Sequence, residues 1–405
     1  MDEQSRLLKE TKFISAQHPI PPGFTLKACW RAGSDYNFRR IIWSPDGTKL
    51  AAICADTIIR IWSFDNQQTQ SLPTNSHLVK AIEWSPNGKM IASATADNKL
   101  LIWDVERASV LKQIETQSSN VTSVAWTPNG RLLAVSSGDR SVQIWNADRW
   151  EMCKALPVPS EATALVWAPR QRYLAAGCSN SVIRVWHTDG WHMLRDYQGH
   201  LAGITDLVWG PTADKLMSAS SDQTIRIWNM DSDREIEILE GYAKEGTLIS
   251  LSADRRLLGT RSFNGGIKLW RTDSWEPIAS FGERRQHNAY WMPSLAFHPN
   301  QQILATVGER DIVVRIWELN PDIVAQSIAP YSIVRLTSAK IVLVGESNVG
   351  KSCLAMRLAE NRYPTDRELG TTHGLRFWRV PPDHFEPQIA LPDGQRREVV
   401  LWDMG

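Results

Sequence analysis

The sequence has few cysteines and no excess of charge of either sign, and each of these absences excludes a class of protein. Its five cysteines are odd in number, lie far apart and never form a Cys-x-x-Cys pair, so the sequence predicts neither a disulfide framework nor a zinc knuckle. The 45 lysines and arginines balance 44 aspartates and glutamates, which disfavours a nonspecific binder of nucleic acids or of anionic membranes. The expected partners therefore include no nucleic acid and no membrane.

Long apolar segments are also missing. No apolar run approaches the roughly 18 residues of a membrane-spanning helix, and the N-terminal sequence MDEQSRLLKETK contains no apolar segment like that of a signal peptide. No spacing of Ser, His and Asp or of paired carboxylates indicates hydrolase chemistry. We therefore expect a soluble, cytoplasmic protein, whose 42% of hydrophobic residues is enough to bury a sizeable core.

Tryptophan, in contrast, is abundant, and its positions are periodic. The chain has 19 tryptophans, and seven of them each close a short aliphatic run, at spacings of 41, 42, 41, 42, 42 and 47 residues. These seven are Trp62, Trp103, Trp145, Trp186, Trp228, Trp270 and Trp317. Such a period predicts a repeat protein in which each repeat forms one supersecondary unit.

A second series of large apolar residues keeps the same register, 19 residues before the closing tryptophan in six repeats and 20 in the last. Its members are Trp43, Trp84, Trp126, Trp167, Trp209, Leu251 and Phe297. Two residues after each member stands a proline, with Ala253 as the exception, and three of these turns read Pro-Asp-Gly or Pro-Asn-Gly. Each repeat is therefore predicted to contain short strands joined by tight turns.

The residues before each closing tryptophan place branched aliphatic side chains two positions apart, as Ile59 and Ile61 do before Trp62. This period of two predicts a strand. Six residues before the tryptophan every repeat carries an Asp or Asn, whose short side chain can hydrogen-bond the backbone of a turn. These residues are Asp56, Asp97, Asp139, Asn180, Asp222, Asn264 and Asp311. A turn is therefore predicted before each of these strands.

This pattern resembles the WD-repeat (β-transducin-type) family, in which each repeat supplies a four-stranded blade of a β-propeller. The resemblance covers roughly residues 24–330 and implies an all-β seven-bladed β-propeller that recognises protein partners. In that family a His, a Ser or Thr, the turn Asp and the closing Trp form a structural hydrogen-bonded set. Only the fifth repeat has the complete set, as His200, Ser218, Asp222 and Trp228, and the second repeat has it in part.

A closed ring of seven blades needs a strand to complete the last one. Residues 24–30 stand at the offset before Trp43 where the other repeats place their outermost strand. The sequence therefore predicts that this N-terminal segment latches onto the seventh blade. The alternative is that residues 323–328, which follow Trp317, fill that place themselves.

From Ala339 the period disappears, and the sequence reads as an apolar strand, a glycine-bounded loop and an amphipathic helix. Residues 345–352, GESNVGKS, match the pattern G-x-x-x-x-G-K-[ST] in that context. Backbone N–H groups of such a loop hold phosphate oxygens, while Lys351 would reach the β- and γ-phosphates and Ser352 would bind Mg²⁺. The predicted nucleotide-binding residues of this loop are Gly345, Glu346, Ser347, Asn348, Val349, Gly350, Lys351, Ser352 and Cys353.

The segment that follows resembles the Ras-like small GTPases, and more closely their Roc-type and bacterial multidomain versions. Thr371 and Thr372 lie 20 and 21 residues beyond Lys351, where that family carries its switch threonine. The resemblance implies that Thr372, or else Thr371, senses the γ-phosphate and binds Mg²⁺. Asp403 ends a predicted strand and begins a sequence like the family's Asp-x-x-Gly motif, which implies that it holds the Mg²⁺ shell through water. The implied cofactors are GTP or GDP and Mg²⁺.

The chain stops inside that motif, before any water-positioning Gln and before the Asn/Thr-Lys-x-Asp sequence that would select guanine. We expect the 67 residues from Ala339 to be the front portion of an incomplete α/β P-loop NTPase (Ras-like) domain, within an N-terminal fragment of a longer protein. No catalytic residue can be assigned, and we expect this fragment to be inactive as an enzyme.

The predicted organisation is an N-terminal tail at residues 1–23, the propeller at 24–328, a linker at 329–338 and the partial Ras/Roc-like GTPase domain at 339–405. The predicted function is a protein-interaction propeller coupled to a GTP-binding switch, with slow GTP hydrolysis in the longer protein. Two alternatives stay open: a pure scaffold with a non-functional phosphate loop, and an ATP-dependent signalling NTPase.

Overall fold

The computed structural model falls into two compact units, Met1–Ser327 and Ile328–Gly405. The residues it describes are 20–31, 38–54, 56–66, 68–74, 78–116, 120–210, 214–230, 235–239, 247–262, 266–282, 294–307, 313–320, 323–324, 335–343, 376–380 and 395–403. The first unit is all-β apart from a helical turn at Ile323 and Val324, as far as these residues show.

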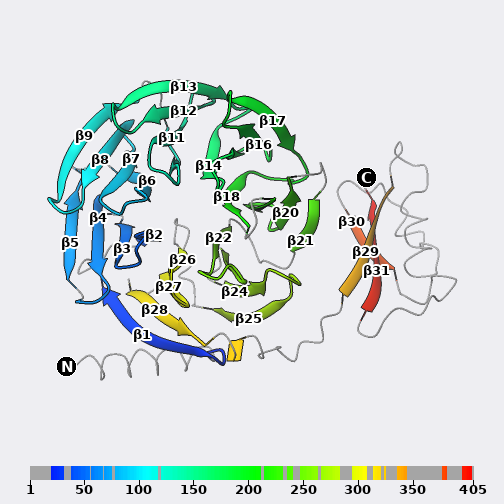
Figure 1. The fold of residues 1–405 in the computed structure, drawn as a ribbon. Helices are drawn as coiled ribbons and strands as arrows, with labels where there is room; N and C mark the ends of the chain where they lie inside the picture. The colour runs from blue at the N-terminus through cyan, green and yellow to red at the C-terminus, as the bar shows by residue number, and fades with distance from the viewer. Residues whose placement is uncertain are drawn as a thin grey trace. The chain divides into compact units, whose positions relative to one another are not determined.

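The first unit forms seven four-stranded antiparallel sheets in its described residues, and Figure 1 shows them as the blades of a ring. The predicted seven-bladed all-β propeller is thereby confirmed. Blade 1 contains β2 (Phe38–Trp43), β3 (Lys49–Cys54), β4 (Ile58–Ser63) and β5 (Thr69–Pro73). Blade 2 contains β6 (Val79–Trp84), β7 (Met90–Thr95), β8 (Lys99–Asp104) and β9 (Ser109–Glu115). Blade 3 contains β10 (Val124–Trp126), β11 (Leu132–Ser137), β12 (Ser141–Asn146) and β13 (Glu151–Pro157).

The remaining blades follow the same plan, with the first strand at the centre of the ring and the last at its rim (Figure 1). Blade 4 contains β14 (Ala162–Trp167), β15 (Tyr173–Cys178), β16 (Ile183–His187) and β17 (His192–Tyr197). Blade 5 contains β18 (Ile204–Trp209), β19 (Lys215–Ser220), β20 (Ile225–Asn229) and β21 (Glu235–Leu239). Blade 6 contains β22 (Thr247–Leu251), β23 (Leu257–Ser262), β24 (Gly266–Arg271) and β25 (Pro277–Gly282). Blade 7 contains β26 (Leu295–Phe297), β27 (Ile303–Val307), β28 (Val313–Leu319) and β1 (Phe24–Arg31).

The hydrophobic core consists of layers between neighbouring blades. One such layer joins Ile53 and Ile59 of blade 1 to Ile82 and Trp103 of blade 2. In blade 2, four of the six residues of β8, which carries the closing Trp103, are buried, whereas only one of the seven residues of β9 is. A strand covered on both faces needs apolar side chains at successive positions, and this explains why the aliphatic runs before the closing tryptophans are nearly continuous.

Four tryptophans of the second series link their blade to the one before it. The indole N–H of Trp43 donates to the carbonyl of Ala296 at 3.2 Å, so blade 1 is bonded to blade 7. The other inter-blade bonds run from Trp84 to Ile42 at 3.3 Å, from Trp167 to Ala125 at 3.0 Å and from Trp209 to Val166 at 3.3 Å. Because these donors are buried, each bond removes an otherwise costly unpaired N–H from the core.

The turn between the first two strands of blade 1 is built by its own side chains. The Ser44 hydroxyl donates to Asp46 Oδ1 at 2.6 Å and accepts the backbone N–H of Lys49 at 2.9 Å. Gly47 has φ +77°, and a Cβ there would lie 2.2 Å from the His298 ring of blade 7. Only glycine satisfies both the left-handed conformation and this close approach.

The N-terminal strand closes the ring, as predicted. β1 pairs antiparallel with β28, from Phe24 opposite Leu319 to Arg31 opposite Val313, and Figure 1 shows it at the rim of blade 7. The alternative is wrong, because β1 already occupies the place outside β28. Val324 instead lies in a helical turn and donates its N–H to the carbonyl of Asn320 at 2.9 Å.

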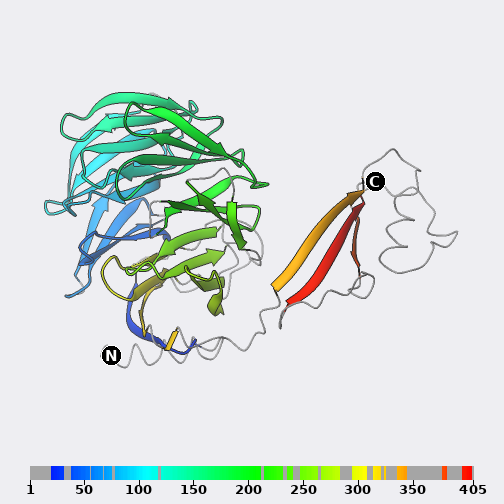
Figure 2. The same ribbon diagram turned by 45° about the vertical axis from the view of Figure 1, so that its right-hand side comes forward.

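The second unit, by itself, contains a three-stranded sheet in its described residues. Its strands are β29 (Arg335–Leu343), β30 (Arg376–Val380) and β31 (Gln395–Asp403), in the order β29-β31-β30. β29 and β31 are parallel and lie side by side (Figure 2), with Leu343 opposite Asp403. β30 runs antiparallel to β31, with Arg376 opposite Asp403.

Candidate functional site

The first candidate site is a cavity of about 240 Å³ among the innermost strands of the propeller. Charged side chains from three different blades line it: Arg40 of β2, Glu83 of β6 and Asp206 of β18. The wall between them is formed largely by β10 and β14. We call this cavity the channel; its walls carry two acids and one base.

The channel changes the titration of its carboxyl groups. Burial raises the pKa of Glu83 to about 7, against the opposing charge of Arg40. Burial also raises the pKa of Asp206, while Arg40 and backbone N–H groups counteract the rise. These N–H groups belong to Leu207, at 3.0 Å from Oδ1, and Ile249, at 3.1 Å from Oδ2.

Sequence reasoning missed these three residues, although a signal was present for two of them. Arg40 and Asp206 both lie three positions before the inner-strand tryptophan, where other repeats carry small or apolar residues such as Ala81 and Ala164. A charge at this position of an innermost strand indicates that its side chain faces a cavity or a partner.

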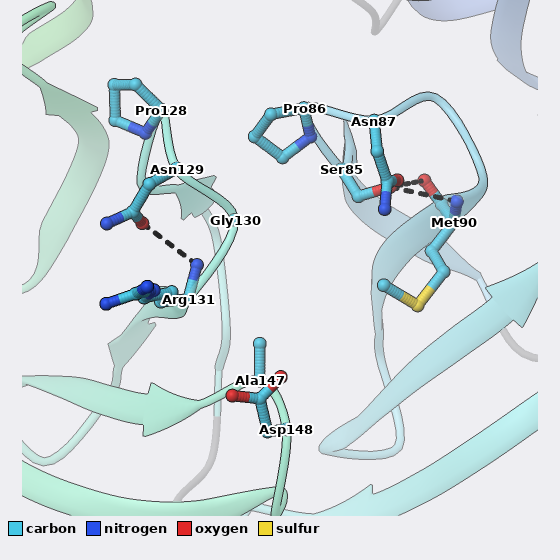
Figure 3. Close-up of a pocket in the computed structure, with 10 residues that line it drawn as sticks. All are labelled: Ser85, Pro86, Asn87, Met90, Pro128, Asn129, Gly130, Arg131, Ala147 and Asp148. Carbon is cyan, nitrogen blue, oxygen red and sulfur yellow. Dashed lines mark hydrogen bonds between the residues drawn. The ribbon is translucent and has the colours of Figure 1, made fainter.

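A second hollow lies between the turns of blades 2 and 3. Figure 3 shows this groove, of about 470 Å³, with the turn at Pro86 facing the turn at Pro128. Both turns are fixed locally: the Ser85 hydroxyl accepts the Met90 N–H at 2.9 Å, and Asn129 Oδ1 accepts the Arg131 N–H at 3.0 Å. The groove thus offers a mostly polar surface between two turns that are fixed by their own hydrogen bonds.

The four residues predicted to form the structural set lie together in blade 5. His200 Nδ1 donates to Asp222 Oδ2 at 2.8 Å, and His200 Nε2 lies 2.7 Å from the Ser218 hydroxyl. That hydroxyl also accepts the Trp228 indole N–H at 2.8 Å. Although burial would raise the pKa of Asp222, the hydrogen bonds from His200, Leu201 and Thr224 lower it.

Three other blades keep part of this arrangement. The closing tryptophan donates to a hydroxyl on the second strand in each of them, from Trp103 to Ser93, from Trp270 to Thr260 and from Trp317 to Thr306. None of these sets borders the channel or the groove. These hydrogen bonds therefore connect strands within one blade and stabilise it.

The comparison with protein families decides the assignment of the propeller. A family model described as the IFT122 first β-propeller matches residues 37–318, from just before β2 to within β28. The chain belongs to this family. As a member of the IFT122 first-propeller family it is a WD-repeat propeller, and β-propellers generally mediate protein–protein interactions.

A second comparison shows a more limited likeness. The chain is 35% identical over 68 residues to the Ras-related protein Rab-18-B of Danio rerio, which is 17% of this chain and 28% of that protein. The chain thus spans less than a third of the length of this curated relative.

The predicted nucleotide-binding residues fall mostly outside the described part of the chain. Residues 345–353 and Thr372 are not among the described residues, whereas Asp403 is the last residue of β31. Among the described residues no group of three or more His, Cys, Asp or Glu side chains could hold a metal ion. The same residues include no helix that is long and apolar enough to cross a membrane.

Proposed function

We propose that this chain is a protein-interaction propeller coupled to a GTP-binding switch. The propeller supplies rigid surfaces, the central channel and the groove between blades 2 and 3, for a protein partner. The second unit supplies the nucleotide site, whose state would be reported to the partner bound by the propeller.

The observation that carries the switch is the sequence GESNVGKS at residues 345–352, which begins two residues after the apolar end of β29. Backbone N–H groups of this loop would hold phosphate oxygens, and Lys351 would neutralise the β- and γ-phosphate charge. Likeness to a Ras-related protein over 68 residues supports a guanine nucleotide rather than ATP.

The strand order of the second unit supports the same proposal. β29 leads into the loop, and its parallel neighbour β31 ends at Asp403, opposite Leu343. In open α/β sheets ligands bind at the carboxyl ends of parallel strands, and the carboxylate oxygens of Asp403 are donors that suit Mg²⁺. Ser352 and Thr372 would complete the Mg²⁺ shell, where the ion neutralises phosphate charge.

The test is binding of a fluorescent GTP analogue, with Mg²⁺, to the protein as its cell makes it. Lys351→Ala is expected to weaken binding at least about tenfold, because a cation on the β- and γ-phosphates is lost. Lys340→Ala, which removes a lysine of β29 outside the loop, is the matched control and is expected to bind normally.

Competition with unlabelled nucleotides identifies the base. GTP is expected to displace the probe at much lower concentration than ATP. Equal displacement by ATP would favour the ATP-dependent signalling NTPase. If Lys351→Ala binds the GTP analogue as well as the wild type does, the phosphate loop is not the binding site and the pure scaffold is favoured.

A further inference from the structure

Exposed apolar side chains gather on one part of the propeller's rim. Of the seven large hydrophobic residues that are exposed among the described ones, five lie on the outermost strands of blades 2, 3 and 4. They are Val110 and Leu111 on β9, Met152 on β13, and Met193 and Leu194 on β17. Figure 1 shows these three strands following one another around the rim.

These residues occupy equivalent places in the three blades. Val110, Met152 and Met193 lie opposite the closing residues Trp103, Trp145 and Trp186 in the strand register. Because the blades repeat the same geometry, three equivalent positions form a row across neighbouring strands rather than along one strand. We name this row, together with the basic row described next, the rim stripe.

A row of basic residues runs beside the apolar one. Lys112, Lys154 and Arg195 lie opposite Ile102, Ile144 and Val185, again at one register position. Both lysines are exposed, and the guanidinium of Arg195 lies 5.5 Å from the centre of the Tyr197 ring. Acidic residues of the same strands, such as Glu115 and Glu151, do not share one register position.

The strand edges of the rim stripe are poorly suited to accept another strand. In each blade the register shifts between the two rows, at Leu111, Cys153 and Leu194. Such a bulge interrupts the edge pattern of N–H and C=O groups. A partner would therefore be recognised through side chains.

The neighbouring blades end the stripe on both sides. In blade 1 the equivalent positions hold Thr69 and Gln70, and in blade 5 they hold Glu235 and Glu237. Blade 6 holds Pro277 and Ala279 at these positions and blade 7 holds Leu26 and Ala28, so the combination of apolar and basic rows is restricted to three of the blades.

We infer that the rim stripe of blades 2 to 4 is a docking surface for an acidic protein segment with apolar side chains. The apolar row would bury the partner's apolar side chains, and the basic row is complementary to its carboxylates. This inference deepens the protein-interaction role proposed for the propeller and is independent of the nucleotide switch.

The first experiment finds the occupant. p-Benzoylphenylalanine placed at Met152 is photo-crosslinked in the cell that makes the protein, and the crosslinked peptide is sequenced. The inference requires a protein segment rich in Asp and Glu with apolar residues. A second copy of this chain, a segment without acids, or no adduct at all would overturn it.

The second experiment measures the affinity of a synthetic peptide of that segment. Lys112→Glu with Lys154→Glu is expected to weaken binding at least about tenfold, and so is Leu111→Ser with Met152→Ser. The matched control, Lys89→Glu with Arg170→Glu, reverses two exposed bases elsewhere on blades 2 and 4 and is expected to leave affinity unchanged.

Thermal melting checks that all variants are folded. Their melting temperatures are expected to equal that of the wild type, because the substituted side chains are exposed. Equal loss of affinity in the control pair would overturn the inference. So would binding of the wild-type protein to phosphatidylserine vesicles that the rim-stripe variants lose, since the surface would then be a membrane contact. None of these results depends on whether GTP binds.

Discussion

The tryptophans of this propeller perform two different tasks. Closing tryptophans such as Trp228 donate to a hydroxyl inside their own blade, whereas those of the central strands, such as Trp84, donate to a carbonyl of the preceding blade. Both kinds of donor are buried, so the loss of an acceptor leaves an N–H without a partner.

The loss of an acceptor is expected to have its largest effect at Ser218, because the Ser218 hydroxyl contacts both Trp228 and His200. Ser218→Ala is expected to lower the free energy of unfolding by about 2–3 kcal/mol, since two buried polar groups lose a partner together. Urea unfolding measures the loss. Ser93→Ala is the control, because Ser93 accepts only the Trp103 indole and should cost about 1 kcal/mol; equal losses would contradict a special role of Ser218.

The blade 5 set could be predicted because its four residues belong to one repeat at known spacings. The inter-blade bonds could not, because spacing within a repeat does not say which carbonyl of the next blade lies near an indole. Thr260 was missed although it lies 10 residues before Trp270, as Ser218 does before Trp228, and Thr306 was missed because it lies 11 residues before Trp317.

The closing strand β1 is the element that turns seven sheets into one ring. Its Trp30 is 5% exposed and stacks on Trp62 of blade 1, with ring centroids 6.0 Å apart. β1 therefore contributes both the outer edge of blade 7 and part of the layer between blades 7 and 1.

Deleting residues 1–30 is expected to lower stability by more than the roughly 3–5 kcal/mol of a single buried tryptophan truncation. A clear fall in melting temperature would show it. Deleting residues 1–19 alone keeps β1 and should change the melting temperature little. An unchanged melting temperature after the longer deletion would contradict the role of β1 in closing the ring.

The position of β1 was predictable from one offset, since residues 24–30 precede Trp43 as the outermost strands precede the other inner tryptophans. The bulge at Lys27, between Leu26 and Ala28, was not. Bulges depend on how strand edges meet at the rim, and the residue pattern is the same with or without them.

The channel is a property of the complete ring, because its charged residues come from blades 1, 2 and 5. Burial raises the pKa of Glu83 from 4.5 to about 7. A carboxyl whose pKa is raised by folding stabilises the protein below its ordinary pKa, and that contribution is lost as the pH rises from 4.5 to 7.

Glu83→Gln removes this pH dependence. The variant is expected to equal the wild type near pH 4.5 and to exceed it by about 3 kcal/mol at pH 8, as measured by urea unfolding across this range. Glu115→Gln, on the exposed outer strand β9, is the control and should leave the profile unchanged. Parallel profiles of Glu83→Gln and wild type would show that the channel does not hold the Glu83 carboxyl away from water.

The pairing of Phe24 with Leu319 has a consequence for synthesis on the ribosome. At 5–20 residues per second, the roughly 300 residues between these partners take about 15–60 s to be made. For most of that interval the residues of β1 are outside the ribosome while their partner strand does not yet exist. Trp30 and the open edge of β1 are thus exposed to the cell in every newly made molecule, until β28 emerges and the ring can close.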